Sequence, residues 1–204
     1  MGLTVVATGF AAGRPLTGDR KAELHEQLAL PEFQVRRKAA IELSRAGDNS
    51  GVPMLVEAMS CLTNRNDRYN CIVALRIAKD RRAIPALIKA ADDSSPDVRS
   101  ISLAVLGEVK ATNAYDVIVS HLNDIDRDLG PIPIQPATAA CYALAELGDK
   151  RAIPYLVKAL DQWQAEPQAS RALRQLTGHD FRRRDEWKDW WKKEEPNHRV
   201  EATE

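Results

Sequence analysis

The residues that could carry catalysis or hold a metal ion are few and scattered. The four histidines are His25, His121, His179 and His198. No two of them have the spacing of metal ligands. The sequence also has no His-Glu-x-x-His, Gly-x-Ser-x-Gly, P-loop or dinucleotide-binding glycine pattern. We therefore expect no catalytic residue, no metal and no cofactor, and the sequence favours a protein that is not an enzyme.

One acidic segment comes close to a calcium-binding loop. Asp124, Asp126 and Asp128 alternate as the first ligands of such a loop do. The glycine that should follow, Gly130, is one place late, and the twelfth position is Gln135 instead of glutamate. We interpret residues 124–136 as an acidic surface insertion that ends in a proline-rich stretch. It could be a contact element for a partner or a tolerated insertion without a role.

Charge and cysteine content exclude several classes of function. Lys plus Arg and Asp plus Glu both number 29, so the formal net charge is zero. Such a chain has no overall attraction to phosphate backbones, and its basic clusters at 36–38, 81–82 and 182–184 have acids nearby. Three cysteines without paired spacing argue against a disulfide framework. No apolar run reaches membrane-span length and the N-terminus lacks signal-peptide features, so we expect no membrane or nucleic-acid partner and a cytoplasmic location.

A repeated motif must position whatever site the chain has. Pro53, Pro85, Asp116 and Pro154 each begin a similar apolar segment, about 31 to 38 residues apart. The second residue past this anchor is Leu55, Leu87, Ile118 or Leu156, and the third is Val56, Ile88, Val119 or Val157. These spacings fit one stripe of a helix. The fifth position past the anchor is alanine in three of the repeats and histidine, His121, in the remaining one. We interpret His121 as a structural or surface histidine.

Each of these helices follows another apolar, alanine-rich segment, so the repeat unit is a pair of helices. Arg36, Arg68 and Arg99 occupy one column of these first segments. A two-helix unit cannot bury both apolar faces alone, whereas stacked neighbours can. The prediction is an all-α, right-handed α-α superhelix of about five helical hairpins over residues 19–181. It is preceded by an N-terminal extension at 1–18 and followed by a tryptophan-rich capping helix with a polar tail at 182–204.

The repeats resemble a known class. Asp97-Val98-Arg99 with Leu106-Gly107, and Leu147-Gly148-Asp149 leading to Pro154, are similar to the consensus of phycobilisome-lyase-like HEAT repeats. The resemblance covers residues 31 to 177 and is specific for the fold, because this repeat serves many roles. It implies two alternatives to a plain scaffold. One is a bilin lyase-like subunit acting on a phycobiliprotein, and the other is a DNA-binding or repair protein.

The three tryptophans near the C-terminus share one helix face. Trp187, Trp190 and Trp191 stand at i, i+3 and i+4. Such a cluster could cover the open end of the repeat stack, which terminal repeats require. It could also form a site for an aromatic ligand or a peptide.

The second helices of such repeats are expected to line the concave side and to bind partners. If the Leu and Val columns face inward, a stripe of mixed polarity is left exposed. Its residues are Met54, Glu57, Lys89, Asp93, Ser120, Asp124, Tyr155, Lys158 and Gln162. Mixed signs with isolated apolar residues suit a protein or peptide better than a polyanion. We therefore predict a bacterial, non-enzymatic scaffold that binds a protein or peptide through this face.

Overall fold

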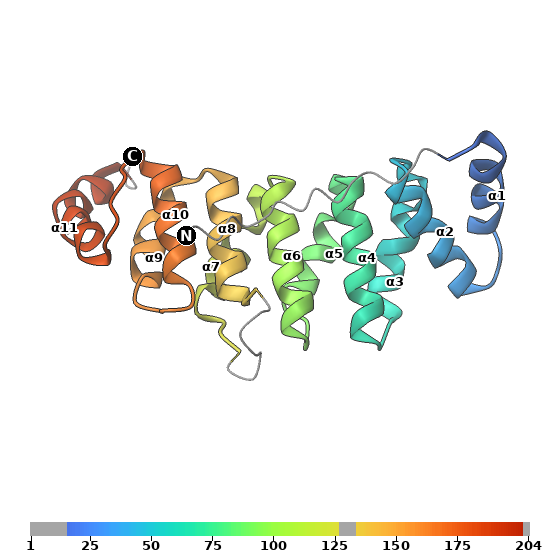
Figure 1. Cartoon of the computed structure of the whole chain (residues 1–204), viewed down its shortest axis with the longest axis horizontal. Helices are drawn as coiled ribbons and strands as arrows, with labels where there is room; N and C mark the ends of the chain where they lie inside the picture. Colours follow the sequence, from blue (N-terminus) through green and yellow to red (C-terminus); the bar gives the residue numbers. More distant parts are fainter. Residues whose placement is uncertain (1–15, 127–133, 202–204) are drawn as a thin grey trace. The chain divides into compact units, whose positions relative to one another are not determined.

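The computed structural model describes residues 16–126 and 134–201, and side chains as far as residue 195. Throughout these residues the regular structure is helical (Figure 1). The chain divides into two compact units, one up to Ala86 and the other from Leu87 onward, and we describe each by itself. The all-α fold of stacked helical hairpins is the predicted one. Residues 1–15, which make up most of the predicted N-terminal extension, lie outside the described residues.

The first unit begins with helix α1, Gly18–Leu28, where the sequence predicts a helix near 19–30. It packs on α2, Phe33–Arg45, through a small core in which Leu24 and Leu43 are fully buried. The helices α3, Val52–Cys61, and α4, Arg65–Ala78, follow, and α2, α3 and α4 all contact one another. Helix α5, Ile84–Ala90, crosses the boundary between the units.

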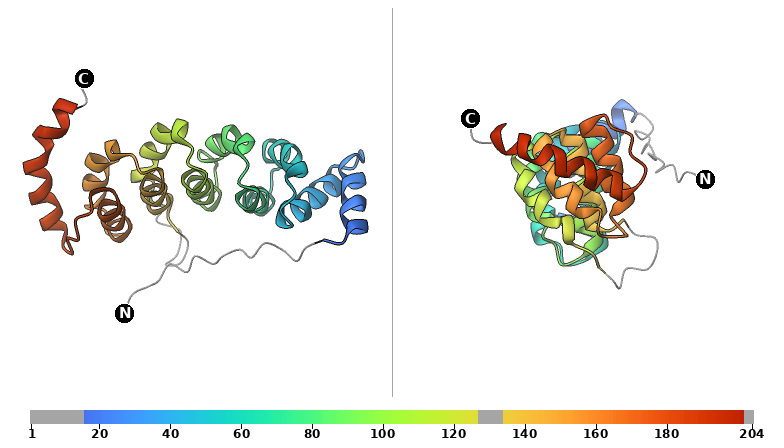
Figure 2. Two further views of the ribbon diagram at one scale, coloured as in Figure 1. Left: turned by 90° about the horizontal axis from the view of Figure 1, so that it is seen from above. Right: turned by 90° about the vertical axis from the view of Figure 1, so that its left-hand side faces the viewer.

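The second unit carries three further pairs of helices. They are α6 (Pro96–Glu108) with α7 (Tyr115–Ser120), α8 (Pro136–Leu147) with α9 (Ile153–Ala159), and α10 (Glu166–Thr177) with α11 (Arg184–Glu201). The first helices of these pairs pack side by side, α6 against α8 and α8 against α10. In Figure 2, α7 and α9 form a second row beside them.

Local signals account for where the helices begin. Proline occupies the first turn of α3, α6, α8 and α9, where its missing N–H costs no helical hydrogen bond. Short 3-10 turns precede the second helices α3, α5, α7 and α9, and three of these turns are capped by an aspartate. Their caps Asp48, Asp80 and Asp149 each accept a hydrogen bond from the backbone N–H two residues later.

Left-handed residues close several helices. Gly148 ends α8 with a φ of 74°, a conformation that glycine adopts without steric cost. Lys79 takes the same role after α4 with a φ of 49°. In the third repeat the left-handed residue is Lys110, which follows the end of α6.

The buried face of the second helices departs from the predicted stripe in two ways. The Leu column is buried as expected, with Leu55, Leu87, Ile118 and Leu156 at most 1% exposed. The Val column is half-buried in three repeats and buried only at Val157. Met54, predicted to be exposed, is only 7% exposed. The prediction for Met54 was wrong because α2 and α4 both contact α3 and cover more of its circumference than one stripe.

Two glycines allow close approach of neighbouring helices. A Cβ placed on Gly107 of α6 would lie 2.5 Å from the Cα of Ala143 on α8. In the first unit, a Cβ on Gly51 would lie 2.6 Å from the Cα of Ala40. Glycine is therefore required at both contacts, because a methyl group would push the backbones apart.

No helix among the described residues is both long enough and apolar enough to cross a membrane.

Candidate protein-binding surface

Four of the predicted stripe residues of the second unit are exposed on its second helices. Lys89 lies on α5, Ser120 at the end of α7, and Tyr155 and Lys158 on α9. Tyr155 is 44% exposed, which is a high fraction for an aromatic residue. Within the described part of the chain neither Lys89 nor Lys158 has an ion pair. The two ammonium groups are therefore free to contact a partner.

In the first unit, Glu57 is the predicted stripe residue that reaches the surface. Its carboxylate lies 3.5 Å from the guanidinium of Arg36, a distance at the limit of a hydrogen bond. Met54 on the same helix is buried, as described above. The first unit thus offers one charged residue of the predicted surface.

Three other predicted residues are half-buried and held by contacts within the second unit. Asp93 accepts a hydrogen bond of 2.8 Å from the backbone N–H of Ser95. The side-chain amide of Gln162 donates to the side-chain oxygen of Asn123. Asp124 is the most strongly engaged, because it receives hydrogen bonds from both Arg99 and His121. We therefore interpret Asp93 and Asp124 as structural residues.

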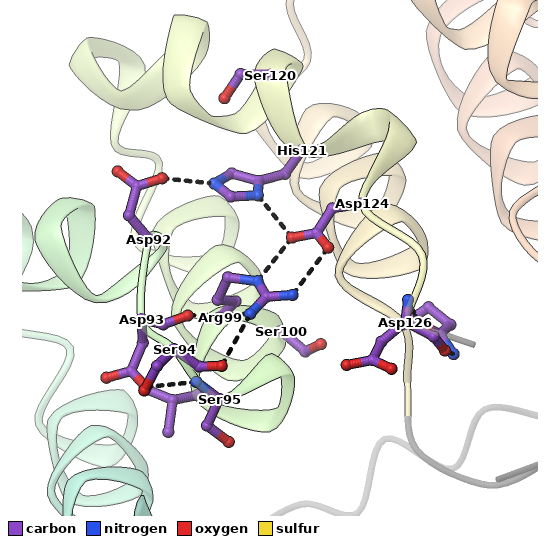
Figure 3. Close-up of polar contacts among 12 residues, drawn as sticks. Asp92, Asp93, Ser94, Ser95, Arg99, Ser100, Ser120, His121, Asp124 and Asp126 are labelled. Atoms are coloured by element: carbon purple, nitrogen blue, oxygen red, sulfur yellow. Dashed lines mark hydrogen bonds and ion pairs between the residues drawn. The ribbon is translucent and has the colours of Figure 1, made fainter. Parts of the chain in front are cut away.

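A polar network surrounds Asp124 (Figure 3). Arg99 on α6 donates to both of its carboxylate oxygens, at 2.7 and 2.9 Å. His121 Nδ1 lies 2.9 Å from Asp124 and its Nε2 lies 3.2 Å from Asp92. A carboxylate can only accept hydrogen bonds, so this arrangement satisfies both ring nitrogens when both carry a proton. The 8% exposed His121 is thus a structural histidine that ties three segments of the unit together.

The charged groups in this network shift one another's pKa. Burial acts to raise the pKa of Asp124, but the hydrogen bonds from Arg99 and His121 outweigh it and hold the pKa below the usual value. The hydrogen bond to Asp124 raises the pKa of Arg99 in turn. The pair is therefore ionised at neutral pH.

The same network anchors the start of the acidic insertion. The side chain of Gln135 accepts from the backbone N–H of Asp126 and donates to its carbonyl, both at 2.8 Å. The Ser100 hydroxyl donates to the carbonyl of Ile134 at 2.6 Å. Asp128 and Gly130, which we weighed as parts of a calcium loop, lie outside the described residues. Gln135 thus joins the two ends of the insertion.

The most exposed large apolar side chain among the described residues is one that the repeat pattern does not predict. Trp163 follows α9 in the segment before α10 and is 79% exposed. It borders a surface depression of about 590 Å³ whose lining is Asn123, Ile125, Gln162, Trp163 and Gln164. Gln162 belongs to the predicted stripe, and the segment that carries it follows α9, the helix of Tyr155 and Lys158. The signal in the sequence is a tryptophan with a glutamine on each side, between two helices.

The C-terminal tryptophans pack mainly against the chain itself. Trp187 is fully buried, and its indole N–H donates to the Ser170 hydroxyl on α10 at 3.1 Å. Its ring meets Phe181 and Trp190 edge-on, with centroids 4.9 and 5.9 Å apart. These contacts are those expected of a cap over the last repeat. Because Trp187 is buried, it is not available to bind an aromatic ligand or a peptide.

Two of the cysteines are poor nucleophiles. Burial raises the pKa of Cys71 to about 11 and that of Cys141 to about 12. Cys61 is exposed, and all three are free thiols. Among the described residues no group of His, Cys, Asp or Glu is arranged to hold a metal ion.

Several arginines of the basic clusters are paired with acids. Arg37 lies 3.0 Å from Asp67. Arg82 binds its own cap, Asp80, at 2.7 Å. This pairing reduces the free positive charge of the first two clusters, which a phosphate backbone would require.

The comparisons with known proteins agree with these repeats. A model of HEAT repeats matches residues 21–107, and a model of the PBS lyase HEAT-like repeat matches residues 137–162. The chain is a HEAT-repeat protein of the PBS lyase-like class. Among solved structures, this HEAT-repeat chain is similar to the complex of CpcE and CpcF of phycocyanin lyase from Nostoc sp. PCC7120. The TM-score is 0.63 at 23% identity, over 82% of this chain and 67% of that one, which is a likeness of fold. No curated protein matches its sequence.

Proposed function

We propose that this HEAT-repeat protein is a scaffold that binds another protein through the exposed residues of its second helices. The surface is defined by Lys89, Ser120, Tyr155 and Lys158, all in the second unit. The observation that carries the proposal is the exposed Tyr155 next to the unpaired cation of Lys158 on α9. An aromatic anchor with a charge beside it is typical of protein interfaces.

The solved structure with the similar fold is itself a complex of two proteins, CpcE and CpcF. This supports a protein as the partner. The neutral chain and its paired arginines disfavour nucleic acid. HEAT repeats bury their apolar faces in the stack, so the residues left on the surface are those that can recognise a partner.

Capture of partners by matched variants tests the proposal. The tagged chain and its Lys89→Glu and Lys158→Glu variants are compared in extracts of the source organism by quantitative mass spectrometry. Arg171→Glu is the control, because Arg171 is an exposed cation on a first helix of the same unit. We expect a defined protein that the wild type and the control retain and that both surface variants lose at least tenfold. Equal retention by all four proteins contradicts the proposal.

A second candidate is a bilin lyase-like subunit acting on a phycobiliprotein. It is supported by the match of residues 137–162 to the PBS lyase HEAT-like repeat and by the fold shared with a phycocyanin lyase complex. It predicts that the chain binds a tetrapyrrole or a phycobiliprotein. The visible absorbance spectrum of a bilin, alone and in the presence of an apo-phycobiliprotein, is recorded with and without the chain. An unchanged spectrum in both settings removes this candidate.

A further inference from the structure

We infer that the depression beside Trp163 binds an uncharged, proline-containing segment of the partner in an extended conformation. The inference rests on the proposed function, because the segment that lines the depression follows α9, the helix that carries Tyr155 and Lys158. It identifies the kind of segment that the partner presents there.

The first argument is that the described residues that line the depression carry no charge. Their side chains are three amides, one indole and one isoleucine. In a chain of which 28% of the residues are charged, such a surface provides no partner for a charged segment. A charged side chain placed here would lose water without gaining an ion pair. The segment that fits is therefore neutral.

The second argument is the supply of hydrogen-bond donors. In the described part of the chain, the indole N–H of Trp163 and the side-chain amide of Gln164 have no partner. The side-chain NH₂ of Asn123 also has none, because its contact with Gln162 uses the oxygen. A helical partner satisfies its own carbonyls, whereas an extended one leaves them free to accept. These donors suit the carbonyls of an extended backbone. The side-chain oxygen of Gln162 is a buried acceptor without a partner among the described residues, and it suits the N–H of a non-proline residue in the same segment.

The third argument is the exposed indole. Polyproline II segments have no internal hydrogen bonds and are already extended before they bind. They dock on aromatic side chains with little loss of conformational entropy. The 79% exposed ring of Trp163 offers such a face, and the depression of about 590 Å³ lies within the range of small binding sites.

The fourth argument is the rigid support of the site. Asn123 and Ile125 flank Asp124, which Arg99 and His121 hold in place. The clamp between Gln135 and Asp126 fixes the backbone just after Ile125. A site that is held before binding loses less entropy when its partner arrives.

A titration with model peptides tests the inference on the full chain. The probes are decaproline and a glycine–serine peptide of the same length, both capped at their ends so that neither is charged. Indole N–H signals are followed by NMR, and affinity is measured by calorimetry. We expect decaproline to bind at least tenfold more tightly than the glycine–serine peptide and to shift the Trp163 indole signal most.

Three variants distinguish binding at this site from nonspecific binding. Trp163→Ala should weaken decaproline binding at least tenfold, and Gln164→Ala about threefold. Tyr69→Ala removes an exposed aromatic residue of the first unit and should leave binding unchanged. No preference for decaproline, or equal binding by Trp163→Ala and the wild type, overturns the inference. Partner capture that depends on Lys158 while decaproline fails to bind would reject this inference alone and leave the proposed function standing.

Discussion

Arg99 holds both carboxylate oxygens of Asp124, its Nε at 2.7 Å and its Nη2 at 2.9 Å, although 25 positions separate the two residues in the chain. The sequence places Arg99 in a repeated arginine column and Asp124 in a partner-binding stripe. The structure joins them in an ion pair instead. The same arginine also donates to the carbonyls of Asp93 and Ser94, as Arg68 does to those of Leu62 and Thr63 in the preceding repeat. In these two repeats the arginine therefore secures the turn that leads into the first helix.

Replacing Asp124 by asparagine should destabilise the protein by about 1–3 kcal/mol at neutral pH, because a half-buried arginine loses its counter-charge. The pKa of Asp124 is lowered in the folded state. Its stabilising contribution is therefore present above the unfolded value of about 3.9 and is lost as the pH falls through the lower folded value. Urea unfolding at pH 7 and at acidic pH measures this. The difference between wild type and Asp124→Asn should shrink on acidification.

The matched control for that experiment is Asp116→Asn, an exposed aspartate on α7 of the same unit. It should change the free energy of unfolding by less than about 0.5 kcal/mol. A gap between Asp124→Asn and wild type that stays constant with pH would show that the ion pair does not carry the effect.

Gly107→Ala should destabilise the second unit by about 1–3 kcal/mol or more, since the added methyl meets the backbone of Ala143 at 2.5 Å. Gly18→Ala is the control, because a Cβ there meets nothing within 4 Å. The control should be neutral or slightly stabilising. Thermal unfolding followed by circular dichroism distinguishes the two, and equal melting temperatures would contradict the close helix contact.

Trp187 and Trp163 should differ sharply in their effect on stability. Trp187→Ala empties a fully buried site and leaves the Ser170 hydroxyl without its donor, so we expect a loss of about 3–5 kcal/mol. Trp163→Ala removes a side chain that is 79% exposed and should change stability by less than about 0.5 kcal/mol. Denaturant unfolding of both variants provides the comparison. Similar losses for the two would mean that one of the burial assignments is wrong.

Thiol labelling should find one reactive cysteine in the native protein. Cys61 is exposed, whereas Cys71 and Cys141 are buried and burial raises their pKa to about 11 and about 12. At about pH 8 a disulfide reagent should modify one thiol per native chain and all three after unfolding. Cys61→Ser should abolish the native reaction. Rapid labelling of more than one native thiol would contradict the buried positions.

Some structural features could be predicted from the sequence because they depend on neighbours along the chain. The prolines of the first helical turns, the left-handed Gly148 and the Leu55 column all act within one or two turns of helix. A repeated local pattern predicts repeated helices, and stacking is the way in which helix pairs with apolar faces exclude water. The exposure of Lys89, Tyr155 and Lys158 follows from the same helical period.

The rest was decided by contacts between segments far apart in the chain. Met54 is buried because two helices flank α3, which no spacing within α3 reveals. Asp124 and His121 form a network because the repeats bring Arg99 and Asp92 beside them. The depression at Trp163 exists because the segment after α9 meets the one after α7. The sequence by itself thus determined the helices and the faces they bury, since hydrophobic period and capping are local, whereas only the tertiary structure decided which polar residues pair and which remain free to bind.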